Sequence, residues 1–214
     1  MKSNFFEFFL LIAGLAESVR FQQWERLEGK LKHVTVGASG IWGINSGGAL
    51  YRRGDGNSWQ VVPGGLQQIE ASKERNVWGA AQKHIWRYNG ITWERADGWL
   101  QQVTSGRSGV WGVSHSTVWY RPYTYGDEAT IGETWEQVSA YPLMKWVASG
   151  VDLVLAIDRS GNLYYRNGIN VSQPTGTSWV KVEGVPLLKQ VDVYNSVVMA
   201  VDTEDNIWSN VIEY

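Results

Sequence analysis

Residues 90–120, GITWERADGWLQQVTSGRSGVWGVSHSTVWY, contain the pattern that decides the fold. The stretch opens with Gly-x-Thr-Trp at Gly90 and continues with three short apolar segments around Val103, Trp111 and Trp119. Polar residues and glycines separate these segments, as they do in β-hairpins. The stretch therefore predicts four short strands joined by tight turns.

The same pattern recurs along the chain and predicts a repeat protein. Gly-x-Ser/Thr-Trp sequences begin at Gly56, Gly90, Gly132 and Gly176. With one Trp upstream of them, the leading tryptophans are 34 to 44 residues apart: Trp24, Trp59, Trp93, Trp135 and Trp179. This spacing is typical of propeller blades, and no stretch after residue 20 has the period of a helix. We expect an all-β fold, a single five-bladed β-propeller with four antiparallel strands per blade.

The two ends of the repeat predict how the ring closes. The segment Trp24–Leu27 has the pattern of an outer strand, but no other strand of a blade precedes it. The chain ends at Tyr214, just after the third strand of the fifth repeat. Pairing of Trp24–Leu27 with Ile207-Trp208 would cover an open sheet edge. We therefore expect the N-terminal strand to close the last blade.

Composition excludes several classes of function. The chain has 214 residues, no Cys and a formal net charge of −2. Without Cys there is no disulfide and no thiolate metal site. A near-neutral chain without runs of Lys or Arg lacks the basic stripe of a nucleic-acid-binding protein, so no nucleic-acid partner is expected.

The N-terminal segment predicts export. An apolar run covers Phe8–Ala16, and small residues follow at Ala16 and Ser18, as a signal-peptidase site requires. The run is too short to span a bilayer, so no membrane insertion is expected. We predict a signal peptide at residues 1–18, a propeller domain at residues 19–214 and a secreted protein. The alternative is a buried, uncleaved segment and a cytoplasmic protein. A glycosylation sequon at Asn170 agrees with export.

The second strands, exemplified by Ile41-Trp42-Gly43-Ile44 and Val110-Trp111-Gly112-Val113, carry a family resemblance. Together with the Gly-x-Ser/Thr-Trp signature they resemble tectonin repeats over about residues 22–214. The resemblance implies a β-propeller lectin that binds lipopolysaccharide and surface glycans, including O-methylated or N-acetylated sugars, in innate defence. Six repeats are common in that family, so six blades remain an alternative. Its secreted animal members carry cysteines, whereas this chain has none.

Third-strand aromatics followed by Arg are the first candidates for carbohydrate binding. They are Tyr51 with Arg52, Trp86 with Arg87, Trp119 with Arg121, and Tyr164 with Arg166. An aromatic ring packs against the C–H face of a pyranose, and polar neighbours bind its hydroxyls. The structural alternative places the aromatic inside and the Arg at the edge, solvated or paired with an acid of the next blade, because adjacent strand residues face opposite ways.

Turn residues and one extra Trp are the remaining candidates. Asn45, Asp158 and Asp202 occupy one equivalent turn position, where they either cap the turn or coordinate sugar hydroxyls or calcium. Calcium has no other support in the sequence, so no cofactor is expected. Trp99 lies in a connection between blades and either binds ligand or packs locally. The leading tryptophans, and the second-strand Trp42, Trp78 and Trp111, are expected to pack in the core.

Catalysis has little support in the sequence. The three histidines are His33, His84 and His115, and no nucleophile elbow, phosphate loop or His-x-x-x-His pair accompanies them. Glu70 and Asp192 are expected to be solvated residues of the central channel, not a glycosidase pair. We predict a non-enzymatic lectin whose partners are glycans on microbial or cell surfaces and whose repeated sites raise avidity. The alternative is a protein-interaction scaffold that does not bind sugar.

Overall fold

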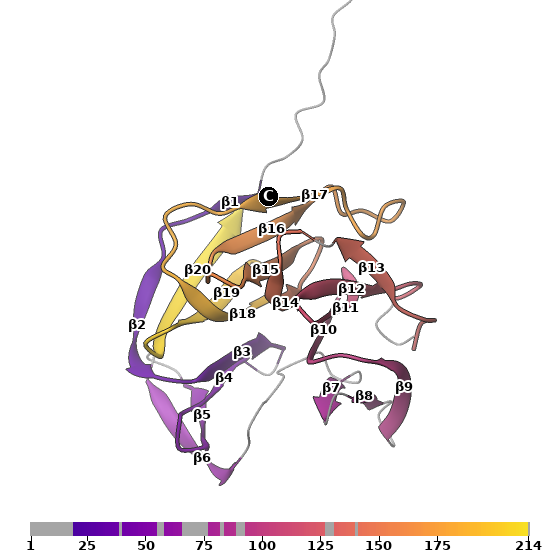
Figure 1. The fold of residues 1–214 in the computed structure, drawn as a ribbon. Helices are drawn as coiled ribbons and strands as arrows, with labels where there is room; N and C mark the ends of the chain where they lie inside the picture. Colours follow the sequence, from indigo (N-terminus) through magenta and orange to yellow (C-terminus); the bar gives the residue numbers. More distant parts are fainter. Residues whose placement is uncertain are drawn as a thin grey trace, which may run out of the picture.

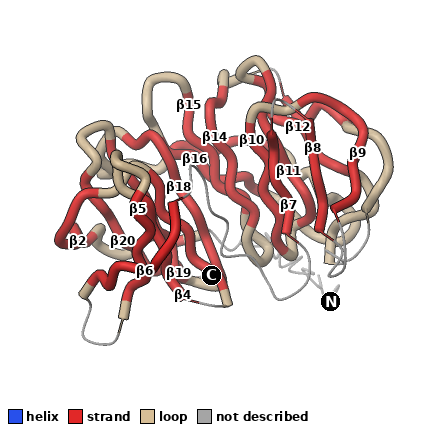
Figure 2. The backbone as a smooth tube through the Cα atoms, turned by 90° about the horizontal axis from the view of Figure 1, so that it is seen from below, coloured by secondary structure: helices blue, strands red, loops and turns tan. Residues whose placement is uncertain are grey.

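A computed structural model describes residues 19–38, 40–54, 58–65, 77–81, 84–88, 93–126, 131–139 and 141–213. These residues form strands, turns and loops, and Figure 2 shows no helix among them. The all-β class predicted from the alternating apolar segments is therefore confirmed. The predicted signal peptide at residues 1–18 lies outside the described residues.

The strands pair antiparallel in five sheets, which follow the sequence repeats. The first sheet consists of β3 (His33–Gly37), β4 (Gly40–Ile44), β5 (Ala49–Arg53) and β6 (Trp59–Gly65). The second consists of β7 (Val77–Ala81), β8 (His84–Tyr88) and β9 (Trp93–Trp99). The third consists of β10 (Gln102–Gly106), β11 (Gly109–Ser114), β12 (Thr117–Arg121) and β13 (Glu136–Ser139). The fourth consists of β14 (Met144–Ser149), β15 (Val154–Asp158), β16 (Leu163–Asn167) and β17 (Ser178–Lys181).

The fifth sheet joins the two ends of the described chain. Its C-terminal strands are β18 (Leu188–Tyr194), β19 (Val197–Asp202) and β20 (Asn206–Glu213). The N-terminal strand β2 (Glu25–Lys30) pairs with β20, with Arg26 opposite Trp208 and Leu27 opposite Ile207. The predicted closure is therefore confirmed. A strand that we did not predict, β1 (Arg20–Phe21), pairs with the far end of β20.

The prediction of five complete blades needs a correction. Four of the five sheets have four or more strands, and the second sheet has three. The predicted first strand of that repeat, around Ile69, lies outside the described residues. The described residues therefore show a propeller arrangement with four complete blades, not five. Figure 1 shows the sheets around a common centre, with β3, β10, β14 and β18 nearest to it.

Packing between sheets explains the leading tryptophans of the repeat. The indole Nε1 atoms of Trp59 and Trp135 donate to the carbonyls of Glu28 and Asp97, each on the outer strand of the preceding sheet, at 3.0 and 2.9 Å. A Cβ on Gly98, whose φ is +90°, would lie 2.7 Å from the Trp135 ring. These leading tryptophans therefore pack between sheets, as predicted.

The Gly of the second strand is also explained by packing. A Cβ on Gly112 would lie 2.3 Å from the Leu100 side chain and 2.7 Å from the Gln102 carbonyl oxygen, so a larger residue would require the backbone to shift. The neighbouring Trp111 is fully buried, and Trp78 on β7 is 2% exposed. The predicted core role of these two tryptophans is confirmed, whereas Trp42 is only half-buried and lies beside Arg52.

Candidate carbohydrate-binding sites

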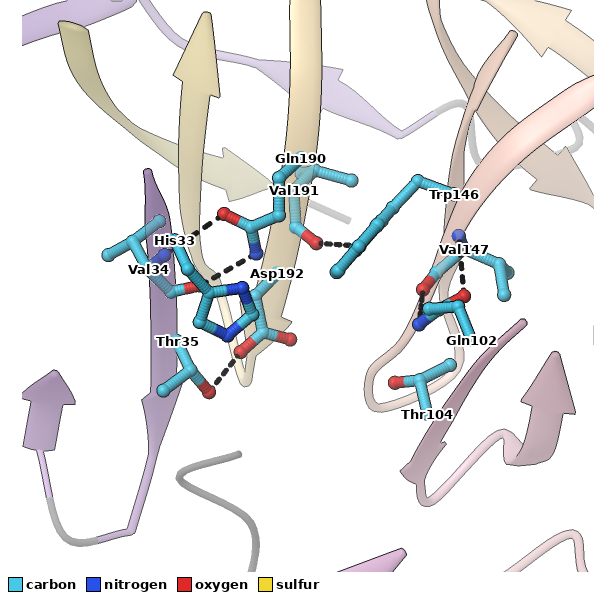
Figure 3. A pocket seen from close by; sticks show the side chains of 10 residues that line it. All are labelled: His33, Val34, Thr35, Gln102, Thr104, Trp146, Val147, Gln190, Val191 and Asp192. Atoms are coloured by element: carbon cyan, nitrogen blue, oxygen red, sulfur yellow. Dashed lines mark hydrogen bonds between the residues drawn. The ribbon is translucent and has the colours of Figure 1, made fainter. Parts of the chain in front are cut away.

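Side chains that line the centre of the ring join neighbouring sheets (Figure 3). Gln102 of the third sheet donates to the Val147 carbonyl at 2.9 Å and accepts from the Val147 amide at 3.2 Å. At the equivalent position of the fourth sheet, the Trp146 indole donates to the Val191 carbonyl at 2.7 Å. A cavity of about 10 Å³ remains among these residues, which is room for about one water molecule. The described part of the channel is therefore a packed junction and not a ligand site.

Asp192 in this channel is buried, so the expectation of a solvated carboxylate is wrong. It is 7% exposed, and one of its oxygens accepts from the Thr35 hydroxyl at 2.7 Å and from the Val36 amide at 2.8 Å. Burial raises the pKa of the Asp192 carboxyl to about 6, although these hydrogen bonds act against the rise. Asp192 thus joins the fifth sheet to the first, and Glu70 lies outside the described residues.

The strand register shows that the four candidate arginines occupy two different positions. Arg52 and Arg87 lie opposite Trp42 and Trp78 on the second strands. Arg52 is exposed, whereas Arg87 is 8% exposed and pairs with Glu94 at 3.2 Å. Arg121 and Arg166 lie one residue further along the third strand.

Arg53, Arg121 and Arg166 are therefore the equivalent residues. Each guanidinium lies over the leading Trp of its own sheet, at 5.5 Å from Trp59, 5.2 Å from Trp135 and 5.2 Å from Trp179. Arg121 is 3% exposed and also pairs with Asp97 of the preceding sheet at 2.7 Å. The structure thus puts these arginines against aromatic rings, with Arg121 and Arg166 buried and Arg53 half-buried.

The third-strand aromatics lie on one face of each sheet, opposite a Gly or Ala of the second strand. Trp86 lies opposite Gly79, and Trp119 lies opposite Gly112. Tyr51, Trp86, Trp119 and Tyr164 are all half-buried, as is Trp208, the fifth copy. Tyr51, Trp119, Tyr164 and Trp208 also pack in part against the hydrophobic core. Each aromatic ring therefore stays partly exposed, as does the side chain of Arg52.

The turn residues Asp158 and Asp202 bind the third-strand aromatic of their own sheet. Asp202 accepts from the Trp208 indole at 2.9 Å and from the Asn206 side chain at 2.7 Å. Asp158 accepts from the Asn162 side chain at 2.8 Å and from the Tyr164 hydroxyl at 3.4 Å. Burial opposes ionisation, yet hydrogen bonds from these neighbours hold the pKa of both carboxyls below its usual value.

Asn45 completes this set in the first sheet. Its Oδ1 accepts from the Ala49 amide at 2.9 Å, and its Nδ2 donates to the Tyr51 hydroxyl at 3.2 Å. The three turn residues therefore cap their turns and at the same time orient the neighbouring aromatic. From the sequence, turn capping and ligand binding are separate alternatives for these residues. In the structure each of them caps its turn and also contacts a candidate binding aromatic.

Trp99 lies at the same edge of the second sheet, in a cluster that sequence reasoning missed in part. It is 63% exposed, and its ring centre lies 5.1 Å from that of His84. The Arg95 guanidinium lies 2.8 Å from Nδ1 of His84, and Arg95 is directly opposite Trp86 on the neighbouring strand. His84 precedes Trp86 by two residues, so alternation could have placed it on the same face. Arg95 could be found only once the hairpin register was known.

One set of positions thus recurs in each sheet, and we call it the rim site. It comprises the turn residue, the residue two before the third-strand aromatic, the aromatic itself and the outer-strand residue opposite it. The fourth sheet has Asp158, Asn162, Tyr164 and Lys181 at these positions, and the fifth has Asp202, Asn206, Trp208 and Arg26. The first sheet has Ala49 and Val61 at two of them, so its rim site is less polar.

The rim site of the fifth sheet carries two cations. The Arg26 guanidinium donates to Oδ1 of Asn206 at 2.6 Å, and the Lys30 ammonium donates to the same oxygen at 2.7 Å. The rim sites of the second, fourth and fifth sheets thus combine an aromatic ring with at least one charged group. Among the described residues there is no group of three His, Asp or Glu side chains that could hold a metal ion. Within the same residues, no helix is long and apolar enough to cross a membrane.

Comparison with known proteins agrees with this repeat architecture. The tectonin domain family matches residues 8–203. The chain belongs to the tectonin family. The perivitellin-2 31 kDa subunit of Pomacea maculata is 25% identical, over 79% of this chain and 82% of that protein.

Two further tectonin relatives match shorter stretches. Tectonin-1 of Physarum polycephalum is 41% identical over 63 residues, which are 28% of this chain and 29% of that protein. Fish-egg lectin of Cyprinus carpio is 29% identical over 91 residues, which are 37% of this chain and 38% of that protein. The predicted family is therefore confirmed.

A solved structure shows a similar fold. Glutaminyl cyclase of Myxococcus xanthus has a TM-score of 0.54 and 9% sequence identity, with 91% of this chain and 96% of that chain covered. At this identity the likeness shows the fold alone, and it carries no argument about activity.

Proposed function

We propose that this chain is a non-enzymatic lectin that binds carbohydrate at the rim sites of the second, fourth and fifth sheets. The observation that carries the proposal is the register, which puts a half-buried aromatic beside at least one charged group in each of these sheets. Membership of the tectonin family, and a relative named as a lectin, support the same function.

The chemistry of the rim sites fits a pyranose ring. The exposed part of the Trp86, Tyr164 or Trp208 ring offers a surface for the C–H face of the sugar. Neighbouring carboxylate, amide and cationic groups offer both acceptors and donors for the hydroxyls. Oxygens of Asp158 and Asp202 already accept hydrogen bonds within the protein, so we propose that binding does not require calcium.

We propose further which ligands the chain binds and what role it has. The ligands would be glycans of microbial or cell surfaces, such as lipopolysaccharide or O-methylated and N-acetylated sugars, and the role would be innate defence. The apolar segment before residue 18 supports secretion.

Two measurements on the same protein test the proposal. A glycan array with methylated and N-acetylated sugars and lipopolysaccharide should show binding that rises steeply with ligand density, because several weak sites engage together. Titration calorimetry with a soluble sugar from the array should give a stoichiometry near three, not five. No binding at the highest ligand density would favour the scaffold alternative and reject the lectin.

A matched pair of variants tests the choice of site. Arg95→Ala removes a charged residue opposite Trp86, and Val61→Ala changes the equivalent outer-strand position opposite Tyr51 in the first sheet. Both side chains are exposed, so neither change should unfold the protein. Arg95→Ala should lower avidity by about tenfold, the effect of losing about 1.4 kcal/mol, and Val61→Ala should leave it unchanged. Equal effects would show that the rim sites are not the binding sites.

A further inference from the structure

Two long loops at the opposite end of the third strands form an open groove. One follows β12 and carries Tyr123 and Tyr125, and the other follows β16 and carries residues 171–175. The groove has a volume of about 580 Å³, within the usual range for small-molecule sites. It lies outside the repeat, because the loops of the first and second sheets at this end are shorter. No rim residue lines it.

The first wall holds two tyrosine rings in place. Tyr123 is 73% exposed and has a φ of 64°, in the left-handed region that few non-glycine residues adopt. Its neighbour Thr124 is fully buried, accepts from the Val110 amide at 2.8 Å and donates to the Arg121 carbonyl at 2.6 Å. The anchored Thr124 therefore fixes a turn that presents the Tyr123 ring to solvent.

Tyr125 is anchored by its hydroxyl, which donates to Oδ1 of Asp152 at 2.6 Å. Burial, together with this contact, raises the pKa of Tyr125 to about 12. The phenol therefore stays neutral, and its ring remains part of the lining of the groove.

The second wall is a tight turn around Asn170. Oδ1 of Asn170 accepts from the amides of Ser172 and Gln173 at 2.9 and 3.0 Å. Arg166 donates to the Thr175 carbonyl at 2.7 Å, just as Arg121 donates to the Ile131 carbonyl in the other loop. These equivalent arginines thus hold the two loops that form the groove.

We propose that this groove is a separate saccharide site that selects uncharged sugars. Tyr123 and Tyr125, together with Pro174, offer apolar faces for a pyranose, and Ser172 and Gln173 offer hydrogen-bonding groups. Glu136 is exposed and is the one charged side chain among the described lining residues. A carboxylate in the lining of the groove disfavours sialylated and phosphorylated sugars through like-charge repulsion.

The test uses an array that carries neutral glycans beside their sialylated and phosphorylated counterparts. Tyr123→Ala should reduce binding to one group of neutral glycans by at least tenfold. Tyr141→Ala, which truncates another exposed tyrosine outside the groove, is the matched control and should change nothing. Glu136→Gln should raise binding to the charged counterparts and leave the neutral glycans bound.

Rim variants separate this proposal from the function proposed above. Arg95→Ala should leave the Tyr123-dependent binding intact, so either proposal can fail while the other holds. The melting temperature of each variant should match that of the parent protein, since all four side chains are exposed. No Tyr123-dependent glycan on the array, or equal loss with Tyr141→Ala, would overturn the proposal. The proposal would also be overturned if Tyr123→Ala weakened binding to a proline-rich peptide but to none of the glycans.

Discussion

Two junctions in the ring use the same device with different consequences. Between the third and fourth sheets, the Gln102 amide bonds both backbone groups of Val147, 45 residues away. Between the fifth and first sheets, the Gln190 amide does the same with Val34, 156 residues away, at 2.6 and 3.1 Å. The closing junction therefore contains the contact that already joins neighbours within the chain, in addition to the pairing of β2 with β20.

The two junctions differ at the residue two positions after the glutamine, which is Thr104 in the third sheet and Asp192 in the fifth. At the third-to-fourth junction the Thr104 hydroxyl accepts from the Ser149 amide at 3.2 Å. At the closing junction a buried carboxylate, Asp192, accepts from the Thr35 hydroxyl. One junction is therefore neutral and the other carries a titratable group. A single residue thus decides whether the same contact between blades responds to pH.

The largest expected loss of stability comes from replacing Gln102 or Gln190. Gln190→Ala and Gln102→Ala each leave a buried amide and a buried carbonyl without a partner. Each change should lower the free energy of unfolding by about 2 to 4 kcal/mol, as measured by urea denaturation. Gln137→Ala, at an exposed position on β13, is the control and should have little effect. A clear difference between the two junction variants would show that the junctions are not equivalent in energy.

A smaller loss is expected at the junction between the fourth and fifth sheets. Trp146 makes one hydrogen bond there, where the glutamines make two. Trp146→Phe keeps an aromatic ring but leaves the Val191 carbonyl unpaired, so the free energy of unfolding should fall by about 1 to 2 kcal/mol. A loss as large as that of Gln102→Ala would show that packing, and not the hydrogen bond, dominates this junction.

The pH dependence of stability should identify the closing junction. The pKa of Asp192 is raised to about 6, so the folded state takes up a proton more readily than the unfolded state. Stability therefore rises as pH falls through 6, by about 1 kcal/mol between pH 7 and pH 5. Asp192→Asn should flatten this rise in melting temperature.

Asp158 and Asp202 act in the opposite direction, because their pKa is lowered and their stabilisation is lost as pH falls below the usual range of a carboxyl. Asp158→Asn should therefore leave the rise between pH 7 and pH 5 unchanged. A rise that persists in Asp192→Asn would assign it to another group.

The smallest expected effect is on ligand binding. Asp192 lies in the packed channel, away from the rim sites and the groove. Asp192→Asn should thus leave glycan avidity at pH 7 within twofold of the parent protein. A larger change would show that the closing junction influences the binding sites.

The repeat and its closure could be predicted because both rest on periodic patterns. The leading Trp of each unit and the Gly of the second strand recur at nearly constant spacing, and packing between sheets requires both. Alternation also explained why an aromatic and its adjacent Arg diverge.

The alignment of the arginines could not be predicted with the same certainty. A shift of one residue moves a side chain to the other face of a sheet. The sequence pattern aligns Arg52 with Arg121, whereas in the structure Arg53 is the residue equivalent to Arg121. The sequence lacked the strand register that distinguishes these positions.

Features that join different repeats were also beyond the sequence pattern. The burial of Asp192 depends on Thr35 in the first sheet, and the groove depends on loops from two sheets. Arg95 and His84 become neighbours only through the pairing of β8 with β9. Local patterns thus predicted each unit well, and the contacts between units required the structure.

Strand β16 has a consequence for how the molecule could act on surfaces. Its first residue, Leu163, follows the turn of a rim site, and the loop after its last residue, Asn167, forms one wall of the groove. Five residues of extended chain span about 16 Å, so the two proposed sites open at opposite ends of the sheet. A single chain with both sites occupied would cross-link two glycan-bearing surfaces and agglutinate particles without first forming a dimer.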